Sequence, residues 1–325
     1  MKPWQKNAIL AVAVLAFGAA RMPFEAGLAK ELRAAHLTAP DLQIGTGERI
    51  GQTSTAVALG GLRTLVATFL NLKAFSYFQE LRWDELAETF DTIVDLAPRT
   101  PYYWDAGSSH LAYDAASYYL SQSTLPPLRR KEAWRASIRQ GRAFLERGIR
   151  NNPQDWTLLT KLGNILSDSN KFSAYADQDK VFLDAADAYR RAAATGEAPP
   201  FVKRAELWPL ARVRGKEKEA LELAHRFYAE KSNRVPTLKC LVFVLEAHEN
   251  PGMDLRKRAV EIFGSEQEAY DQLSNHWMRI REKFPVYGVA ATLELLGKSL
   301  GIPPEKSVLS QPMPPPADMD RFFSR

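Results

Sequence analysis

The feature that most constrains the fold is a helical spacing of apolar residues that continues, with short breaks, from Thr55 to Leu300. Apolar side chains recur there every three or four residues, which is the period of one face of an α-helix. No stretch alternates polar and apolar residues for long enough to predict a strand. The sequence therefore predicts an all-α protein, built from successive helices that are separated by short turns.

Breaks in this spacing set the expected helix boundaries. Ser265 and Glu268 have the spacing of a capping box, which predicts a helix start at that point. Six prolines lie beyond Ile302, so residues 301–325 are expected to form a Pro-rich disordered tail. The expected helices are Ala58–Leu81, Trp83–Leu96, Pro101–Leu120, Leu128–Arg150, Trp156–Leu166, Lys180–Ala194, Phe201–Val213, Lys216–Lys231, Pro236–His248, Met253–Phe263, Ser265–Lys283 and Val286–Leu300.

The amino end has the pattern of an export signal or a membrane anchor. Lys2 and Lys6 precede an apolar run over residues 8–20, and Arg21 ends that run. Residues 1–22 are therefore expected to be a cleaved signal peptide or a retained single-pass anchor, and the residues leave both outcomes open. A buried helix of a cytosolic protein is the remaining alternative. Residues 23–54, which are rich in glycine and proline near their end, are expected to be a linker.

Composition excludes several classes of protein. The single cysteine, Cys240, excludes a disulfide framework and a multi-cysteine metal site. A mean hydropathy of −0.30 excludes a protein with many membrane spans. No catalytic motif is present, and His110 with Asp114 supplies only two residues of a metal site. The sequence therefore predicts a protein without metal or cofactor that is not an enzyme.

The helices also contain a recurring small–large–small spacing. Such residues let two helices approach closely, and a proline then ends the second helix. Pro98 and Pro153 would be two such prolines, and they are 55 residues apart where a regular tetratricopeptide unit has about 34. The residues that carry the spacing are Phe90 before Pro98, Trp104 after it, Gly141, Leu145 and Gly148 before Pro153, Leu162 and Gly163 after it, and Ala185, Tyr189 and Ala192.

The chain resembles bacterial tetratricopeptide-repeat-like (TPR-like) proteins that carry one N-terminal membrane segment. The resemblance rests on Leu59–Ala67, Trp83–Pro98, Trp104, Leu111–Tyr113, Gly148–Pro153 and Leu162–Gly163. The resemblance covers residues 55–195 well and the remainder thinly. It implies an irregular TPR-like solenoid of antiparallel helix pairs over residues 55–300. It also implies a scaffold that faces the cell envelope and binds other proteins or peptides, without a cofactor or catalytic residues. The long interval between the two prolines departs from a regular array.

The resemblance further implies which side chains would line a concave, partner-binding face. These are regularly spaced positions on the first helix of each pair, and several of them suit a peptide backbone or carboxylate. They are Tyr102, Asp105, Ser109 and Tyr113 in one pair, and Thr157, Thr160, Asn164 and Asp168, with Lys161 beside them, in the next. The alternative is that these side chains are merely exposed.

A second candidate surface is a basic stripe between residues 129 and 142. Such a stripe could bind an acidic protein, anionic lipid or an anionic polymer, or it could simply be a solvated face. Nucleic acid is not an expected partner, because no aromatic residues interleave the arginines as stacking platforms. The stripe consists of Arg129, Arg130, Lys131, Arg135, Arg139 and Arg142.

Together these observations predict a membrane-tethered envelope scaffold, single-pass in the bacterial cytoplasmic membrane with its helical domain on the periplasmic side. Two alternatives stay open. One is an exported all-α enzyme acting on a cell-wall or sugar polymer, with Trp104 and Trp156 as sugar platforms and Asp105 and Asp114 as acids. The other is a helical subunit of a larger membrane assembly.

Overall fold

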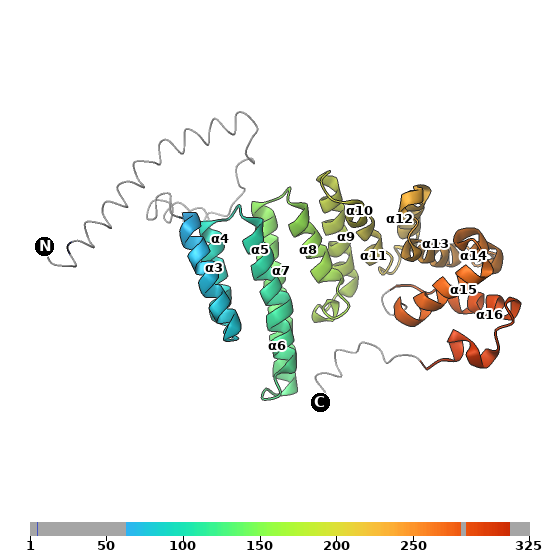
Figure 1. Ribbon diagram of the computed structural model, residues 1–325, viewed down its shortest axis with the longest axis horizontal. Coiled ribbons are helices and arrows are strands. Elements are labelled where there is room, and N and C mark those ends of the chain that lie inside the picture. The colour runs from blue at the N-terminus through green and yellow to red at the C-terminus, as the bar shows by residue number, and fades with distance from the viewer. Residues whose placement is uncertain (1–4, 6–62, 281–283, 313–325) are drawn as a thin grey trace. The chain divides into compact units, whose positions relative to one another are not determined.

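The computed structural model describes residue 5 and residues 63–280 and 284–312, and every regular element among them is helical (Figure 1). No strand occurs in these ranges, so the prediction of an all-α protein is confirmed. The α-helices are α3 (Arg63–Gln79), α4 (Trp83–Leu96), α5 (Pro101–Ser109), α6 (Ala116–Ser121), α7 (Pro127–Asn151), α8 (Trp156–Ser167), α9 (Gln178–Ala194), α10 (Pro200–Ala205), α11 (Leu207–Leu210), α12 (Glu217–Ala229), α13 (Pro236–Glu249), α14 (Leu255–Phe263), α15 (Glu266–Asn275) and α16 (Val289–Ser299).

The chain divides into two compact units, Met1–Leu158 and Leu159–Arg325, and the division falls within α8. The sequence predicted one repeat domain over residues 55–300 and offered no signal for this division. The predicted signal or anchor (1–22) and linker (23–54) lie outside the described residues, apart from residue 5.

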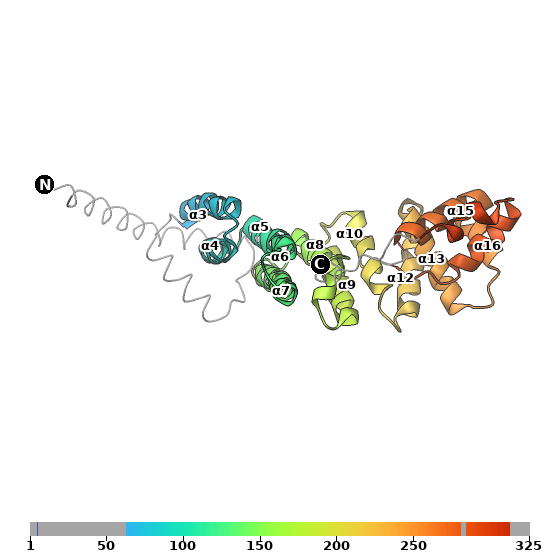
Figure 2. The same ribbon diagram turned by 90° about the horizontal axis from the view of Figure 1, so that it is seen from below.

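In the first unit, α3 packs against α4, and the long helix formed by α5, η2 (His110–Ala115) and α6 packs against α7 (Figures 1 and 2). The segment η2 is a π-helical turn that continues α5 into α6 without a break. Prolines open both α5 and α7, where the missing backbone N–H has no helical partner in any case. Asp84 and Glu85 in the first turn of α4 complement its dipole.

Glycines set the close packing of α7 against the helix that begins with α5. A Cβ atom added to Gly148 would lie 2.6 Å from Cγ of Trp104, and one added to Gly141 would lie 2.7 Å from the backbone nitrogen of Ala112. Both distances are shorter than van der Waals contact, so only glycine fits at these positions. Trp104 fills the resulting contact and donates from Nε1 to the Pro98 carbonyl oxygen at 2.8 Å.

The same carbonyl oxygen ties three parts of the first unit together. Asn152, which follows α7, donates from Nδ2 to Pro98 O at 2.9 Å and to Gly148 O at 3.1 Å. The start of α5, the end of α7 and the segment after α4 are therefore held at one point. Arg147 adds a further link, because its Nη1 lies 2.6 Å from Oδ1 of Asp91 on α4.

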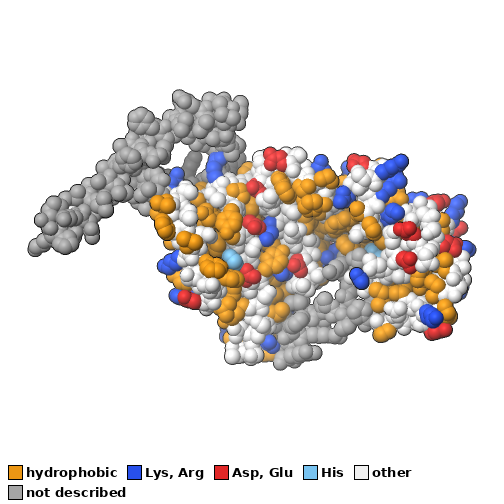
Figure 3. All heavy atoms as spheres, viewed as in Figure 1, with side chains coloured by type: hydrophobic (Ala, Val, Ile, Leu, Met, Phe, Trp, Pro, Cys, Tyr) orange, Lys and Arg blue, Asp and Glu red, His pale blue; other side chains and the backbone are white. Residues whose placement is uncertain are grey.

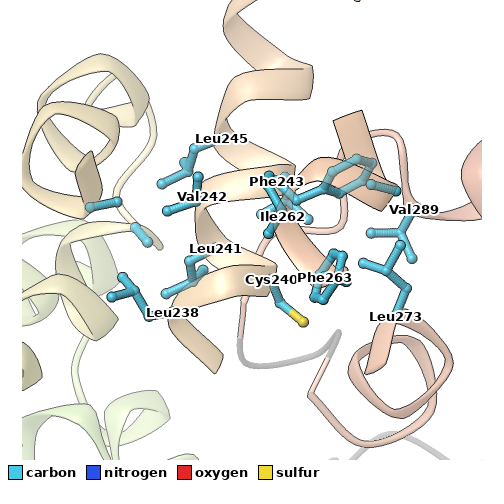
Figure 4. Close-up of a cluster of buried hydrophobic side chains, with 14 of the residues drawn as sticks. Leu238, Cys240, Leu241, Val242, Phe243, Leu245, Ile262, Phe263, Leu273 and Val289 are labelled. Carbon is cyan, nitrogen blue, oxygen red and sulfur yellow. The ribbon is translucent and has the colours of Figure 1, made fainter. Parts of the chain in front are cut away.

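The second unit is organised around α13, which is buried along most of its length. Leu238 and the residues from Cys240 to Leu245 are almost inaccessible to solvent, and they contact side chains of α12, α14, α15 and α16 (Figure 4). A helix surrounded on all sides is apolar all round, which explains why its sequence shows little polar patterning. Cys240 belongs to this core, and burial raises the pKa of its thiol to about 12.

Local signals fix the helix starts in this unit. At the starts of α9, α14 and α15, the helix-capping side chains accept a hydrogen bond from the backbone N–H three residues further along the chain. These caps are Asp177, Asp254 and Ser265. Gly264 ends α14 with a left-handed conformation (φ 104°) that suits glycine. The predicted capping box forms only in part, because the Glu268 carboxylate accepts from Gln272.

Three predicted elements differ from the observed ones. The helix expected over Phe201–Val213 is broken between α10 and α11, since Pro209 supplies no backbone N–H to continue it. The helix expected over Ser265–Lys283 changes at His276 into the π-helical turn η5 (His276–Ile280). The expected disordered tail contains two 3-10 turns, η6 (Pro304–Lys306) and η7 (Val308–Ser310), and Val308 is buried in the core of the second unit. Residues 313–325 lie outside the described ranges.

Candidate partner-binding surfaces

The first predicted group lies on α5 and η2. Tyr102 is 61% exposed, and its ring packs edge-on against Tyr103 at 5.5 Å between centroids. Asp105 and Ser109 are adjacent on the same face, where the Ser109 hydroxyl donates to the Asp105 carbonyl oxygen at 2.7 Å. Tyr113 follows within the π-helical turn, and all four residues are at least partly accessible. The structure thus presents an exposed aromatic residue beside a carboxylate on one helix.

Thr157, in the first turn of α8, has a structural role. Its hydroxyl and backbone N–H both donate to Oδ1 of Asp155, which caps the start of the helix. Its hydroxyl proton is therefore engaged within the helix start. Thr157 lies in the first unit, whereas the remaining members of the predicted group lie in the second.

In the second unit, Thr160, Lys161 and Asp168 are partly accessible and Asn164 is exposed. Asp168 caps the following turn: its Oδ1 accepts from the backbone of Asn170 at 2.8 Å, and its Oδ2 lies 3.5 Å from Nζ of Lys171. Its carboxylate is therefore used locally. Asn164 differs, because only its carbonyl oxygen is engaged.

Asn164 is held by a buried tyrosine. Tyr189 on α9 donates from its hydroxyl to Oδ1 of Asn164 at 2.7 Å, and burial raises the pKa of Tyr189, so the hydroxyl stays protonated as a donor. The Tyr189 ring packs against Gly163, where an added Cβ would lie 2.6 Å from the ring. Within the described part of the chain the Asn164 amide nitrogen makes no hydrogen bond. It is therefore an oriented, exposed donor.

The predicted basic stripe lies on α7, with its charges partly neutralised and partly buried. Arg139 and Arg142 pair with Glu132 and Glu146, each at 2.8 Å. Arg130 is buried, Lys131, Arg135 and Arg142 are partly buried, and Arg129 and Arg139 are exposed. The stripe therefore does not present six free cations on one face. Its role in binding anions stays a prediction.

His110 and Asp114 form a local pair at the start of η2. Nδ1 of His110 lies 2.8 Å from Oδ2 of Asp114, and the imidazole packs against Phe78 at 4.8 Å and Phe90 at 5.7 Å between ring centroids. Across residues 63–280 and 284–312, no group of three or more His, Cys, Asp or Glu side chains has the arrangement of a metal site. The arrangement is that of a packed aromatic cluster.

Sequence reasoning missed an exposed apolar face on α3. Leu65, Phe69, Leu72 and Phe75 are 53%, 63%, 62% and 57% exposed, while Ala67 and Ala74 are buried. The sequence predicted this segment as part of a helix over Ala58–Leu81, without assigning its buried and exposed sides. The signal that could have revealed the face is the placement of the two small residues, because alanines mark the side on which a neighbouring helix approaches closely.

Comparison with protein-family models, with curated proteins and with solved structures finds no match for this chain. Among the helices of the described ranges, none combines the length and apolar character needed to cross a bilayer. The apolar run over residues 8–20 lies outside those ranges.

Proposed function

We propose that this protein is a membrane-tethered scaffold of the cell envelope, which binds other proteins or peptides through the surface of TPR-like helix pairs. The tether would be the apolar run near the amino end, whose lysines precede it as in export signals. The binding surface would include the exposed residues of α5 and, separately, those of α8. No cofactor enters this function.

The packing within each unit supports the TPR-like arrangement. Short turns join α3 to α4 and α6 to α7, as expected for antiparallel neighbours. Gly148 against Trp104, and Gly163 against Tyr189, are small residues that meet large ones across two helices, at the positions expected from the repeat spacing. The long interval between Pro98 and Pro153 also has an explanation, because both helices of that pair are extended.

The observation that carries the binding proposal is the oriented amide of Asn164. A peptide backbone offers carbonyl oxygens, and an exposed amide nitrogen held in one orientation can donate to them with little loss of side-chain entropy. Tyr189 supplies this orientation through its hydrogen bond to the amide oxygen. On α5, Tyr102 would contribute a rigid apolar contact of the kind enriched in protein interfaces.

Crosslinking of intact membranes followed by affinity purification of the full chain tests this function. We expect one or more proteins to co-purify with the wild type, and five- to tenfold less to be recovered with Asn164→Ala, roughly the effect of one lost hydrogen bond. Tyr189→Phe, which removes the hydroxyl and keeps the ring, should weaken recovery in the same direction. Asn170→Ala, at an exposed asparagine of the same unit, is the matched control. Recovery of the chain alone would contradict the proposal.

A further inference from the structure

The exposed face of α3 is unusual because it is apolar. Leu65, Phe69 and Leu72 follow one another at spacings of four and three residues, so they share one side of the helix, and Phe75 extends the same surface. Hydrophobic side chains gather over the end of the first unit formed by α3 and α4 (Figure 3). Four side chains of this size, each more than half exposed, present on the order of 400 Å² of apolar surface, about the size of a functional patch.

The opposite side of α3 is used for packing within the unit. Ala67 and Ala74 are buried, and α4 is the main neighbour of α3, while Phe78 near the end of α3 packs against His110. The apolar stripe therefore faces away from α4. Folding of the described residues leaves it without a cover, so its apolar character requires another explanation.

The charges around the stripe favour one kind of surface. Residues 49–79 contain no aspartate or glutamate, while they contain Arg49, Arg63 and Lys73. Lys73 is exposed, and its Nζ lies 5.3 Å from the centroid of the Tyr77 ring. Of these cations, Lys73 lies beside the stripe, whereas Arg63 precedes the buried Ala67 by one turn and lies on the packed side of α3. An apolar stripe that borders a lysine and contains no carboxylate is the pattern of a helix that lies in the interface of an anionic bilayer.

We infer that α3 is a second membrane contact, which lies along an anionic lipid surface with Leu65, Phe69 and Leu72 in the acyl boundary and Lys73 at the headgroups. This inference rests on the proposed function to the extent that the apolar run over residues 8–20 holds the first unit close to the bilayer. It goes beyond that function, because a tether alone leaves the orientation of the helical units free. Docking of α3 would fix which face of the first unit points away from the lipid.

Environment-sensitive labels on the full chain test this contact. The native Cys240 is replaced by alanine, and single cysteines at Leu72 (L72C), at Ala13 in the apolar run (A13C) and at the exposed Gln140 on α7 (Q140C) each carry an NBD (nitrobenzoxadiazole) fluorophore. The protein is reconstituted in vesicles of phosphatidylethanolamine with 30% phosphatidylglycerol, with and without lipids that carry a nitroxide quencher in the acyl chain. We expect the label at residue 72 to shift to shorter wavelength and to be quenched, and the label at residue 140 to remain in water.

The charge dependence provides a second readout. Lys73→Glu should lower the ratio of docked to undocked α3 at least about fivefold, as expected for one cation near an anionic surface. Replacing phosphatidylglycerol with phosphatidylcholine should act in the same direction. Gln140→Glu, at the exposed reference position on α7, controls for a general effect of added charge.

The labels separate failure of this inference from failure of the tether. Quenching at residue 13 with an aqueous signal at residue 72 would overturn docking of α3 and leave the tether intact. Aqueous signals at both positions would overturn both. A label at residue 72 that is shielded from water but not quenched by the lipid nitroxide would overturn docking to lipid and show that protein covers the stripe. Shielding that increases with protein concentration would identify a second copy of the chain as the cover. Shielding that does not change with concentration would identify the chain's own amino-terminal segment.

Discussion

Substitution of Gly148 tests the packing of the first unit most sharply. In Gly148→Ala the new Cβ would lie 2.6–2.8 Å from three atoms of Trp104, and one of these is Cβ, at 2.7 Å, which cannot move without the backbone. Overpacking of this kind costs typically about 3 kcal/mol at its upper end. Alanine regains about 1 kcal/mol through its higher helix propensity. The expected net loss is about 2 kcal/mol, or a fall in Tm of about 4–8 °C for a unit of this size.

The matched control is Gly297→Ala in α16. There the nearest atom, Cε2 of Tyr270, would lie 3.7 Å away, which is ordinary contact, so we expect a gain of about 0.5–1 kcal/mol. Urea unfolding followed by circular dichroism measures both variants. Trp104→Leu should partly rescue Gly148→Ala, which a double-mutant cycle would detect as a favourable coupling. A Gly148→Ala protein as stable as the wild type would refute the close approach of α5 and α7.

Three further predictions concern buried groups of the second unit. His276 donates from Nε2 to the Pro285 carbonyl oxygen at 2.9 Å, and Nδ1 is buried with no partner in the described ranges, so burial lowers its pKa. At low pH the unfolded chain therefore binds a proton on His276 that the folded chain does not. The free energy of unfolding should keep its full value above about pH 6.5 and fall below that pH. The urea midpoint of His276→Asn should lack this pH dependence. Cys240, whose thiol pKa is about 12, should react with a thiol reagent only after unfolding, and fast reaction of the native protein would contradict its burial. Glu246 accepts hydrogen bonds from Nε and Nη2 of Arg258 at 2.6 and 2.7 Å, which lowers the pKa of its carboxyl despite burial. Glu246→Gln should therefore cost about 2 kcal/mol at pH 7, and this cost should begin to fall near the ordinary glutamate pKa of about 4.3 and be lost as the pH falls through the lowered pKa. A cost that does not change with pH would contradict the pairing.

Local spacing was enough to predict most of the helices. Trp83–Leu96 is observed with the predicted bounds. The helix α7 is one residue longer than predicted at each end, and α13 is one residue longer at its carboxyl end. These helices have strong apolar periodicity or clear start signals. The break after α10 was missed. Pro209 has no N–H for the carbonyl four residues earlier, but a proline in the first turn of a new helix is tolerated, so the sequence alone does not show where one helix ends and the next begins.

Features that depend on contacts distant in sequence could not be predicted in this way. The π-helical turns at His110 and His276 insert one residue into otherwise regular helices, and no propensity marks them. The apolar spacing of α3 does not distinguish its buried side from its exposed side. The ordered turns after Ile302 depend on the packing of Val308 into the core of the second unit, which local composition does not reveal.

In the candidate surfaces, too, local spacing predicted the positions of the residues but not their contacts. The positions implied by the repeat pattern lie on accessible parts of α5, η2 and α8 and in the turn after α8. The pattern could not distinguish Thr157 and Asp168, which take part in a helix cap and a turn, from Asn164, which is held by Tyr189. Helix spacing predicted the row of cations on α7, whereas their ion pairs depend on rotamers chosen in the folded protein.

Site-specific photo-crosslinking can show whether these helix pairs bind other proteins. A photoreactive phenylalanine analogue is placed at Tyr102 or Asn164 of the full chain in intact membranes, with Gln140, an exposed residue of α7, as the control position. We expect discrete crosslinked products from residues 102 and 164 that are absent at residue 140. The same faint products at all three positions, or none at any of them, would contradict this expectation.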